Sequence, residues 1–169
     1  VVDNVDSQGI WYKSDVHQQN KNFKIEGAHI FADRFQAGFV LPMIERTRQQ
    51  NTQKGLGDIV TSIGYEYLPE WSFNPYKPKG MGFVQVTFPT GKSKVESEMG
   101  GLDSYGNGFW VIGAGTLLTK ILGDWDVFSS LEIHKSFDKS ISNSNFSGEV
   151  KPNLGGNLSL GVGYNLKDY

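Results

Sequence analysis

The 169-residue chain is long enough for one domain with its own core, but 21 glycines, 13% aromatic residues and a mean hydropathy of −0.37 do not suit a helical bundle. A formal charge of −2 without a basic cluster argues against a nucleic-acid partner, and the lack of cysteine excludes a disulfide-stapled domain, a thiolate zinc site and a cysteine nucleophile. The longest uncharged run, residues 104–119, is shorter than the roughly 18 residues of a membrane-spanning helix, so only a closed barrel could carry this chain through a bilayer.

Side chains that alternate between apolar and polar predict about eight β-strands along the chain. Residues 58–68 show the pattern well, because Ile59 and Ile63 point to one face whereas Ser62 and Glu66 point to the other. In chain order, we expect strands at residues 10–16, 23–32, 35–43, 58–68, 81–88, 109–120, 125–137 and 158–166. The first of these is the weakest, because two adjacent rings break its alternation. No helical segment is available to cover the apolar face, so either a second sheet or lipid must cover it.

Short turns tend to alternate with long polar loops. Tight turns are expected at Asp33-Arg34 and Gly123-Asp124, and long loops at residues 45–54, 89–106 and 138–149. Outer-membrane barrels have this asymmetry, with short turns on the periplasmic side and long loops outside, although a soluble β-sandwich can show it by chance. Rings at the strand ends would form two interfacial girdles or take part in ordinary packing: Tyr67, Trp71, Tyr105, Phe109, Trp110, Trp125, Phe137 and Tyr164.

No motif for catalysis, nucleotide binding or metal binding stands out. Gly91-Lys92-Ser93 follows a strand, but Val86 occupies the position where a phosphate-binding loop needs its first glycine. The three histidines lie on separate segments without a carboxylate cluster around them, so we expect no metal site. A G-x-S-x-G elbow is also missing from the sequence. We therefore expect neither an enzyme nor a cofactor.

Charged and amide side chains recur on the polar faces of the expected strands. In a barrel these faces would line a lumen, where paired carboxylates usually mean pore electrostatics and only rarely a hydrolase. The residues expected to line it are Lys24, Glu26, Gln36, Asp58, Glu66, Gln85, Asp126, Glu132 and His134.

Three short motifs at strand boundaries resemble one bacterial outer-membrane family. They are Gly55-Leu56-Gly57-Asp58, Phe88-Pro89-Thr90-Gly91-Lys92, and the run from Leu118-Thr119-Lys120 to Gly123-Asp124-Trp125. The chain is similar in these motifs to the putative transporters associated with the meta-pathway of phenol degradation, which are predicted β-barrels. The resemblance covers roughly residues 35–169 and marks Gly55, Gly57, Asp58, Pro89, Thr90 and Gly91 as motif turn residues.

The resemblance implies a barrel of about twelve strands. This chain is shorter than members of that family, and it lacks their usual ending, in which a terminal aromatic residue follows alternating apolar ones: Asn165 and Lys167 take the alternate positions before Tyr169. We therefore expect one barrel domain spanning residues 1–169 that is truncated at its C-terminus; truncation at its N-terminus stays open.

The leading hypothesis is an antiparallel up-and-down transmembrane β-barrel in the outer membrane of a Gram-negative bacterium. Its partners would be outer-membrane lipid and, as the resemblance implies, small hydrophobic or aromatic solutes that diffuse passively through a porin-like channel. Two alternatives stay open: a structural or adhesive outer-membrane barrel that acts through its long loops, and a soluble lipocalin-like or β-sandwich binding protein. The sequence carries no signal for a particular oligomeric state.

Overall fold

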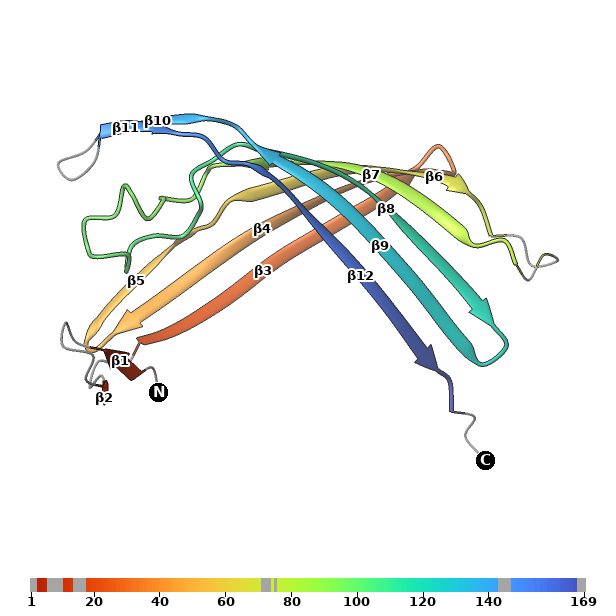
Figure 1. Cartoon of the computed structure of the whole chain (residues 1–169), viewed down its shortest axis with the longest axis horizontal. Coiled ribbons are helices and arrows are strands. Elements are labelled where there is room, and N and C mark those ends of the chain that lie inside the picture. Colours follow the sequence, from red (N-terminus) through yellow and green to blue (C-terminus); the bar gives the residue numbers. More distant parts are fainter. Residues whose placement is uncertain are drawn as a thin grey trace.

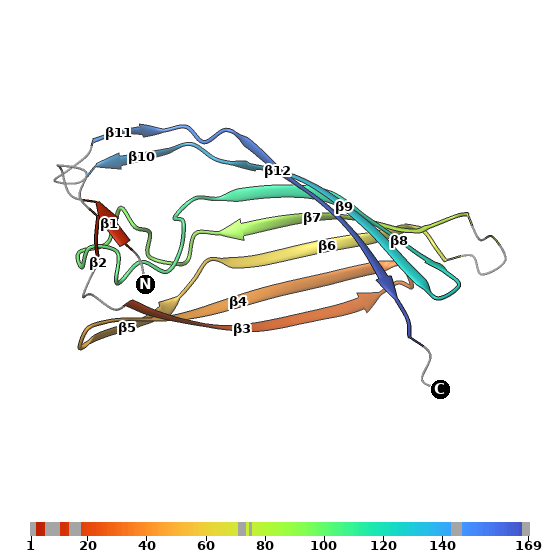
Figure 2. The same cartoon turned by 60° about the horizontal axis from the view of Figure 1, so that its bottom comes forward.

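The protein is all-β, with one large antiparallel sheet that curls into a half-barrel (Figures 1 and 2). The computed structural model describes residues 3–5, 11–13, 18–70, 74, 76–142 and 147–166. Over these residues it contains no helix. Accordingly, the described chain offers no helical segment with the length and hydropathy needed to cross a bilayer. The expectation of an all-β, antiparallel fold is confirmed.

Eight strands form the large sheet, in an up-and-down order. They are β3 (Gln18–Phe31), β4 (Phe35–Arg48), β5 (Asn51–Leu56), β6 (Ile59–Leu68), β7 (Lys79–Phe88), β8 (Val111–Leu122), β9 (Trp125–Ser136) and β12 (Leu154–Tyr164). The spatial order is β12-β9-β8-β7-β6-β4-β3, and β5 pairs with the end of β4 that β6 leaves free. Two short hairpins stand outside it: β1 (Asp3–Val5) with β2 (Trp11–Lys13), and β10 (Lys139–Ser142) with β11 (Ser147–Val150). The expected strand at residues 10–16 therefore reduces to β2 and lies outside the large sheet.

The expectation of a polar loop at residues 45–54 is wrong. β4 runs on to Arg48 and β5 begins at Asn51, so only a tight turn at Gln49 and Gln50 separates them. Gln49 takes the left-handed φ of 54° that such a turn requires. Glu45 accepts ion pairs from Lys21 at 3.0 Å and Lys54 at 2.8 Å, so charged cross-strand pairs stabilise this end of the hairpin.

The loop expected at residues 138–149 also contains regular structure. Its described residues form the β10–β11 hairpin, in which Lys139 faces Val150 and Ser142 faces Ser147. The two tight turns, by contrast, lie where the sequence places them. β3 and β4 are joined across residues 32–34, and β8 and β9 across Gly123 and Asp124, where Gly123 has a φ of 63°.

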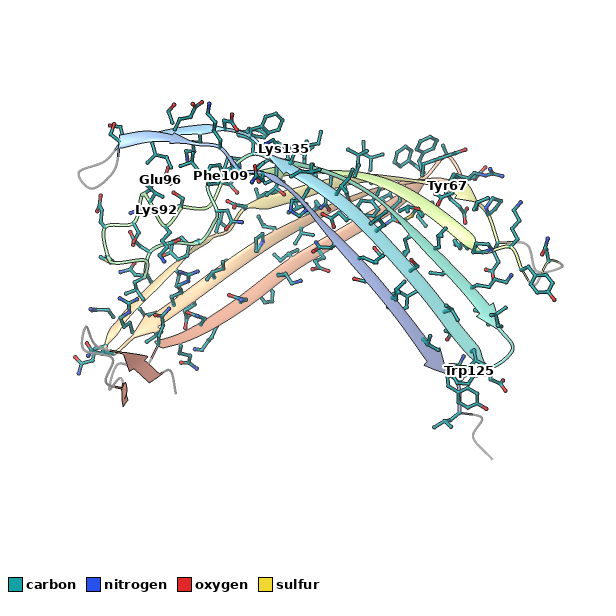
Figure 3. The ribbon with its side chains drawn as sticks, viewed as in Figure 1. Tyr67, Lys92, Glu96, Phe109, Trp125 and Lys135 are labelled. Atoms are coloured by element: carbon teal, nitrogen blue, oxygen red, sulfur yellow. The ribbon has the colours of Figure 1, made fainter. Side chains whose placement is uncertain are left out.

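The connections divide between two ends of the sheet. The turns after β3 and β8 and the ends of β6 and β7 that face each other in sequence lie at one end, called here the turn end (right in Figure 1). The β4–β5 turn, residues 89–110 and the β10–β11 hairpin lie at the other, called here the loop end. Tyr67 and Trp125 mark the turn end of β6 and β9, whereas Lys92 and Glu96 lie at the loop end (Figure 3).

The two faces of the sheet differ in chemistry. What we call the polar face contains one row of register partners: Gly38, Ser62, Gln85, Gly113 and His134. The neighbouring row, Ala37, Ile63, Val84, Ala114 and Ile133, belongs to what we call the apolar face. Because strand side chains alternate, the central strands present the same two faces along the sheet, up to the register shift between Glu66 and Leu68 near the end of β6.

Exposure on these faces is the reverse of that in a water-soluble sheet. On the apolar face Ile63 is 58% and Leu160 73% exposed, whereas on the polar face the Glu66 and Glu132 side chains are only 21% and 22% exposed. Each described strand contacts only the strands beside it, so no second sheet stacks on the apolar face. Apart from glycines, the buried residues of the described chain lie in the segment that follows β7 and precedes β8 in the sequence, where Leu102 is 4% and Asp103 8% exposed.

Candidate functional site: the polar face and its cap

The register places eight of the nine expected lumen residues on the polar face. They are Lys24, Glu26, Gln36, Glu66, Gln85, Asp126, Glu132 and His134. The ninth, Asp58, immediately precedes β6 and turns its carboxylate toward residues 89–110. The sequence pattern thus predicted the face on which these residues lie; that they line a lumen stays a prediction.

Three of these residues meet in the middle of the sheet. Gln85 Nε2 donates to Glu132 Oε1 at 2.8 Å, and His134 Nδ1 lies 3.6 Å from the same oxygen. Gly113 lies between β7 and β9 and makes this contact possible, because a Cβ there would lie 3.0 Å from Gln85 Cγ. Gly155 on β12 makes room for the His134 ring in the same way, since its added Cβ would lie 2.4 Å from His134 Nε2. Glycines on the neighbouring strands therefore allow long polar side chains to lie across the face.

The other expected lumen residues form separate pairs instead of one site. Lys24 and Glu26 pair at 2.9 Å in the middle of β3. Glu66 pairs with Lys79 at 3.2 Å toward the turn end. Asp126 accepts a hydrogen bond at 3.1 Å from the side-chain amide of an asparagine that follows β12. The polar face is thus a broad surface of mixed charge, and over the described residues no group of His, Cys, Asp or Glu could hold a metal ion.

Residues 89–110, called here the cap, pack on the polar face at the loop end, between β5 and the β10–β11 hairpin (Figure 1). The Tyr105 ring lies over Gly55, which faces the same way as its register partner Ile44. A Cβ at Gly55 would lie 2.3 Å from Cδ2 of that ring. Arg46 also reaches the cap from the polar face, and its Nη1 donates to the Gly101 carbonyl at 2.8 Å. Tyr105 therefore covers the polar face and belongs to no girdle on the apolar face.

The first two sequence motifs meet at the base of the cap. Thr90 Oγ1 donates to the Gly57 carbonyl at 2.8 Å and accepts a hydrogen bond from the Ile59 N–H at 3.1 Å. Asp58 accepts from the backbone N–H groups of Gly91 at 3.0 Å and Asn107 at 2.7 Å. The carboxylate of Asp58 thus ties together both ends of the cap.

The remaining motif residues surround this junction. Pro89 directly follows β7, Gly55 lies within β5, and Gly57 lies in the break between β5 and β6. Gly91 needs its small size, because a Cβ there would lie 2.8 Å from the backbone nitrogen of Gly106. These contacts give the motif residues a shared structural role, which is to fix the cap to the loop end of the sheet.

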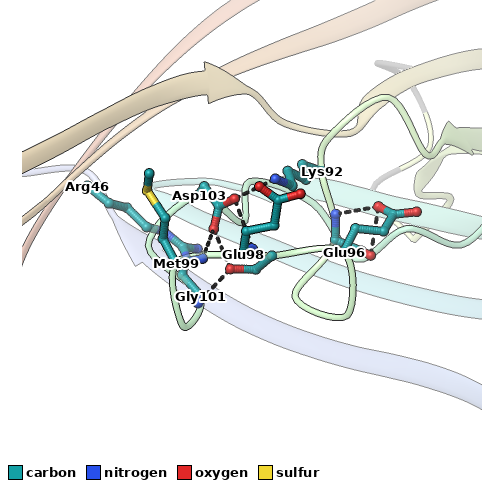
Figure 4. Close-up of polar contacts among 9 residues, drawn as sticks. Arg46, Lys92, Glu96, Glu98, Met99, Gly101 and Asp103 are labelled. Atoms are coloured by element: carbon teal, nitrogen blue, oxygen red, sulfur yellow. Dashed lines mark hydrogen bonds and ion pairs between the residues drawn. The ribbon is translucent and has the colours of Figure 1, made fainter. Parts of the chain in front are cut away.

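Inside the cap, Asp103 is the centre of a network of hydrogen bonds, called here the clasp (Figure 4). Lys92 Nζ donates to its Oδ2 at 2.5 Å, and the Ser97 hydroxyl donates to its Oδ1. The N–H groups of Glu98 and Met99 each donate to it at 3.2 Å. The bond from Lys92, followed by that from Ser97, holds the pKa of Asp103 well below its usual range, and Asp103 in turn raises the pKa of Lys92.

A second acidic residue fixes the other half of the cap. Glu96 accepts hydrogen bonds at 2.9 Å from both the N–H and the hydroxyl of Ser93, and these two bonds lower its pKa. Lys139, at the start of β10, donates to Glu96 at 3.3 Å and to the Gly108 carbonyl at 2.9 Å. The cap is therefore held from one side by β4 and from the other by β10.

The sequence predicts only a polar, glycine-rich loop over most of the cap. One local sequence signal indicates internal hydrogen bonding, because Ser93 and Glu96 form an S-x-x-E pattern in which each side chain can accept a hydrogen bond from the backbone N–H of the other residue. The bonds from Arg46 and Lys139 had no such signal, since both partners lie far away in the sequence.

The rings at the strand ends are only partly as expected. Trp125 packs against Tyr164 with ring centroids 4.8 Å apart, and Phe35 packs against Tyr65 with centroids 4.7 Å apart; both tilted pairs lie on the apolar face near the turn end. At the loop end, Phe88 packs against Trp110 with their centroids 5.0 Å apart. Trp71 lies outside the described residues.

Comparison with protein-family models and with curated proteins found no match for the chain. The likeness to the phenol meta-pathway transporters consequently remains a resemblance in three short motifs.

Proposed function

We propose that this chain forms the wall of an outer-membrane β-barrel and acts as a passive channel. The observation that carries the proposal is the reversed exposure of the two faces on the central strands, where large apolar side chains such as Ile63 are exposed and Glu66 and Glu132 are sheltered. On the edge strand β3 the side chains of Lys24 and Glu26 are 60% and 57% exposed. Monomeric soluble proteins rarely expose contiguous apolar patches of more than a few hundred Å². Lipid is the environment in which a sheet with this exposure buries its apolar face, while pairing with neighbouring strands in a closed barrel satisfies its backbone.

The length of the apolar face agrees with a bilayer. On β4 the apolar alternation runs from Phe35 to Met43, within the roughly 9–11 residues of a transmembrane strand. It ends in the charged row of Lys21, Glu45 and Lys54, which would lie outside the hydrocarbon. Rings border the turn end, as expected of an interfacial girdle.

The polar face would line the passage of such a channel. Its charges are largely paired, as in Lys79 with Glu66 and Lys24 with Glu26, so it has no strong field of one sign. Apolar side chains, among them Met81, Phe83 and Phe128, lie between these pairs on the same face. A mixed surface of this kind suits small, weakly polar molecules. The motif resemblance favours hydrophobic or aromatic solutes within that class.

Membrane insertion and conduction can be tested separately. The protein, refolded in detergent, is mixed with lipid vesicles carrying brominated acyl chains, which quench tryptophans in contact with lipid. We expect strong quenching of Trp125, measured as the difference between the protein and its Trp125→Phe variant. Fluorescence equal to that in unbrominated vesicles would refute membrane insertion.

Conduction is then measured in planar bilayers. We expect step conductances in potassium chloride that fall when phenol or benzyl alcohol enters the passage, while the same concentration of glucose has little effect. Current indistinguishable from a protein-free blank would refute the channel.

A structural or adhesive barrel is the second candidate, and one observation favours it. The cap is the most buried part of the described chain, and it lies on the polar face, where a lumen would be. Small barrels can be filled by side chains or closed by loops. Full membrane insertion with no conductance, together with loss of surface attachment when the β10–β11 hairpin is deleted, would favour this candidate over the channel.

A further inference from the structure

We propose that the cap is a constriction at the loop end of the passage that limits solutes by size, and that the Asp103 clasp holds the cap in this position. This inference rests on the proposed channel function and goes beyond it by assigning the selective element. It begins from the location of the cap, which extends from Arg46 on β4 to Lys139 on β10 across the polar face. Any solute that follows the polar face between β4 and β9 toward the loop end meets the cap.

The cap has a defined shape of its own. Gly100, Gly101 and Gly108 have φ values of 59°, 88° and 75°, a region that other residues enter only at a cost. Asp103 accepts from four donors within the cap, and Ser97 Oγ accepts a further bond from the Gly101 N–H at 2.7 Å. A segment that was merely a connection would gain nothing from such internal bonding.

Size is the property on which the cap can select, because most of its charges are paired, either within the cap or with Lys139 on β10. Lys92 pairs with Asp103 at 2.5 Å, and Lys139 with Glu96 at 3.3 Å. The matched charges leave little net field to attract ions of one sign. The Tyr105 ring over Gly55 supplies bulk in their place.

A thiol placed beneath the cap reports its opening without relying on conduction. Ile44 faces the polar side next to Gly55, and the chain has no cysteine, so Ile44→Cys introduces a single reactive group. Ser130→Cys lies on the same face in the middle of β9 and serves as the reference position. The measurement is the rate of modification by a bulky maleimide in detergent micelles, with and without Asp103→Asn.

We expect Asp103→Asn to raise the modification rate of Ile44→Cys about tenfold while leaving that of Ser130→Cys unchanged, because local opening exposes only groups beneath the cap. Glu98→Gln is the matched control: it removes one negative charge from the cap, but only the backbone N–H of Glu98 belongs to the clasp. Arg46→Gln removes the hydrogen bond from the sheet to the Gly101 carbonyl, and we expect the same rise in the modification rate. This second variant keeps the inference testable if Asp103→Asn folds poorly.

The same variants are then examined in planar bilayers. We expect Asp103→Asn and Arg46→Gln to raise the conductance and admit larger solutes, whereas Glu98→Gln resembles the unmodified protein. Unchanged thiol modification rates in both the Asp103→Asn and the Arg46→Gln backgrounds would overturn the inference, whether or not the protein conducts. Faster thiol reaction with unchanged conductance in a conducting protein would also overturn it, because the cap would then be outside the passage. Absence of conductance in the unmodified protein would refute the proposed function itself.

Discussion

An arginine placed on either side of β6 offers the sharpest test of the membrane assignment. Ile63 and Ser62 are neighbours in sequence, but Ile63 lies on the apolar face and Ser62 on the polar face. Ile63 lies midway between Ile59 and Tyr67 on the apolar face, near the centre of the proposed bilayer span. Ile63→Arg would therefore place a charge at the depth where lipid tolerates it least, whereas Ser62→Arg would direct the same charge toward the lumen.

The expected costs follow from this geometry. An arginine at the midplane of a barrel's lipid face costs about 2–4 kcal/mol of folding free energy, which is roughly a 30- to 1,000-fold change in the folding equilibrium. Ser62 lies between Gly38 and Gln85, and the glycine leaves room for a longer side chain. We therefore expect Ser62→Arg to cost no more than about 1 kcal/mol.

The assay is reversible urea unfolding in lipid vesicles, followed by tryptophan fluorescence, with both variants compared with the unmodified protein. If this sheet instead stands in water as the structure shows it, with Ile63 58% exposed, Ile63→Arg would change stability by no more than about 0.5 kcal/mol. Equal effects of the two substitutions, or a larger one at Ser62, would refute a lipid-facing apolar surface.

Three further predictions concern acid, packing and a turn. The pKa of Asp103 is lowered in the folded protein, so the stability that its carboxylate contributes is complete above the ordinary aspartate pKa of about 3.9 and is lost as the pH falls through the lower folded pKa. The modification rate of Ile44→Cys, corrected for the fraction of thiolate, should therefore stay constant from neutral pH to about pH 4. Gly115→Ala should cost about 1–3 kcal/mol in urea unfolding, because its Cβ would lie 2.5 Å from a β9 carbonyl oxygen, whereas a Cβ at Gly82 has 3.7 Å of clearance and should cost less; equal losses would contradict the packing argument. Gln49→Gly should raise the free energy of unfolding by up to about 1 kcal/mol by relieving the left-handed φ of 54°, and a lower urea midpoint would contradict this.

Apolar alternation predicted the strands in the centre of the large sheet well, because there the same alternation of faces governs both the sequence pattern and the strand pairing. The segment expected at residues 58–68 is β6, Ile59–Leu68, and the one expected at residues 125–137 is β9, Trp125–Ser136. The prediction failed where strands continue past the apolar band. Beyond Met43 the β4–β5 hairpin carries polar side chains on both faces and is stabilised by backbone pairing and by ion pairs at Glu45, which an apolar pattern cannot show.

The polar face and the cap differ in how far the sequence could reveal them. Parity along each strand was sufficient to assign Gln85, Glu132 and His134 to one face, since a residue's face depends only on its position in its own strand. That they meet depends on the register of β7, β8 and β9 and on the small size of Gly113, neither of which is local information.

The cap depends on longer-range contacts still. Its fixed position requires Asp58, a residue that the sequence places at the start of a distant strand, to accept hydrogen bonds from N–H groups at both ends of the cap. A carboxylate at such a junction accounts for an acidic residue at the loop end of a strand without assigning it to solute contact. Asp58 therefore contributes to the proposed passage by positioning the cap, whereas Glu132 and His134 remain free to face the solute beyond it.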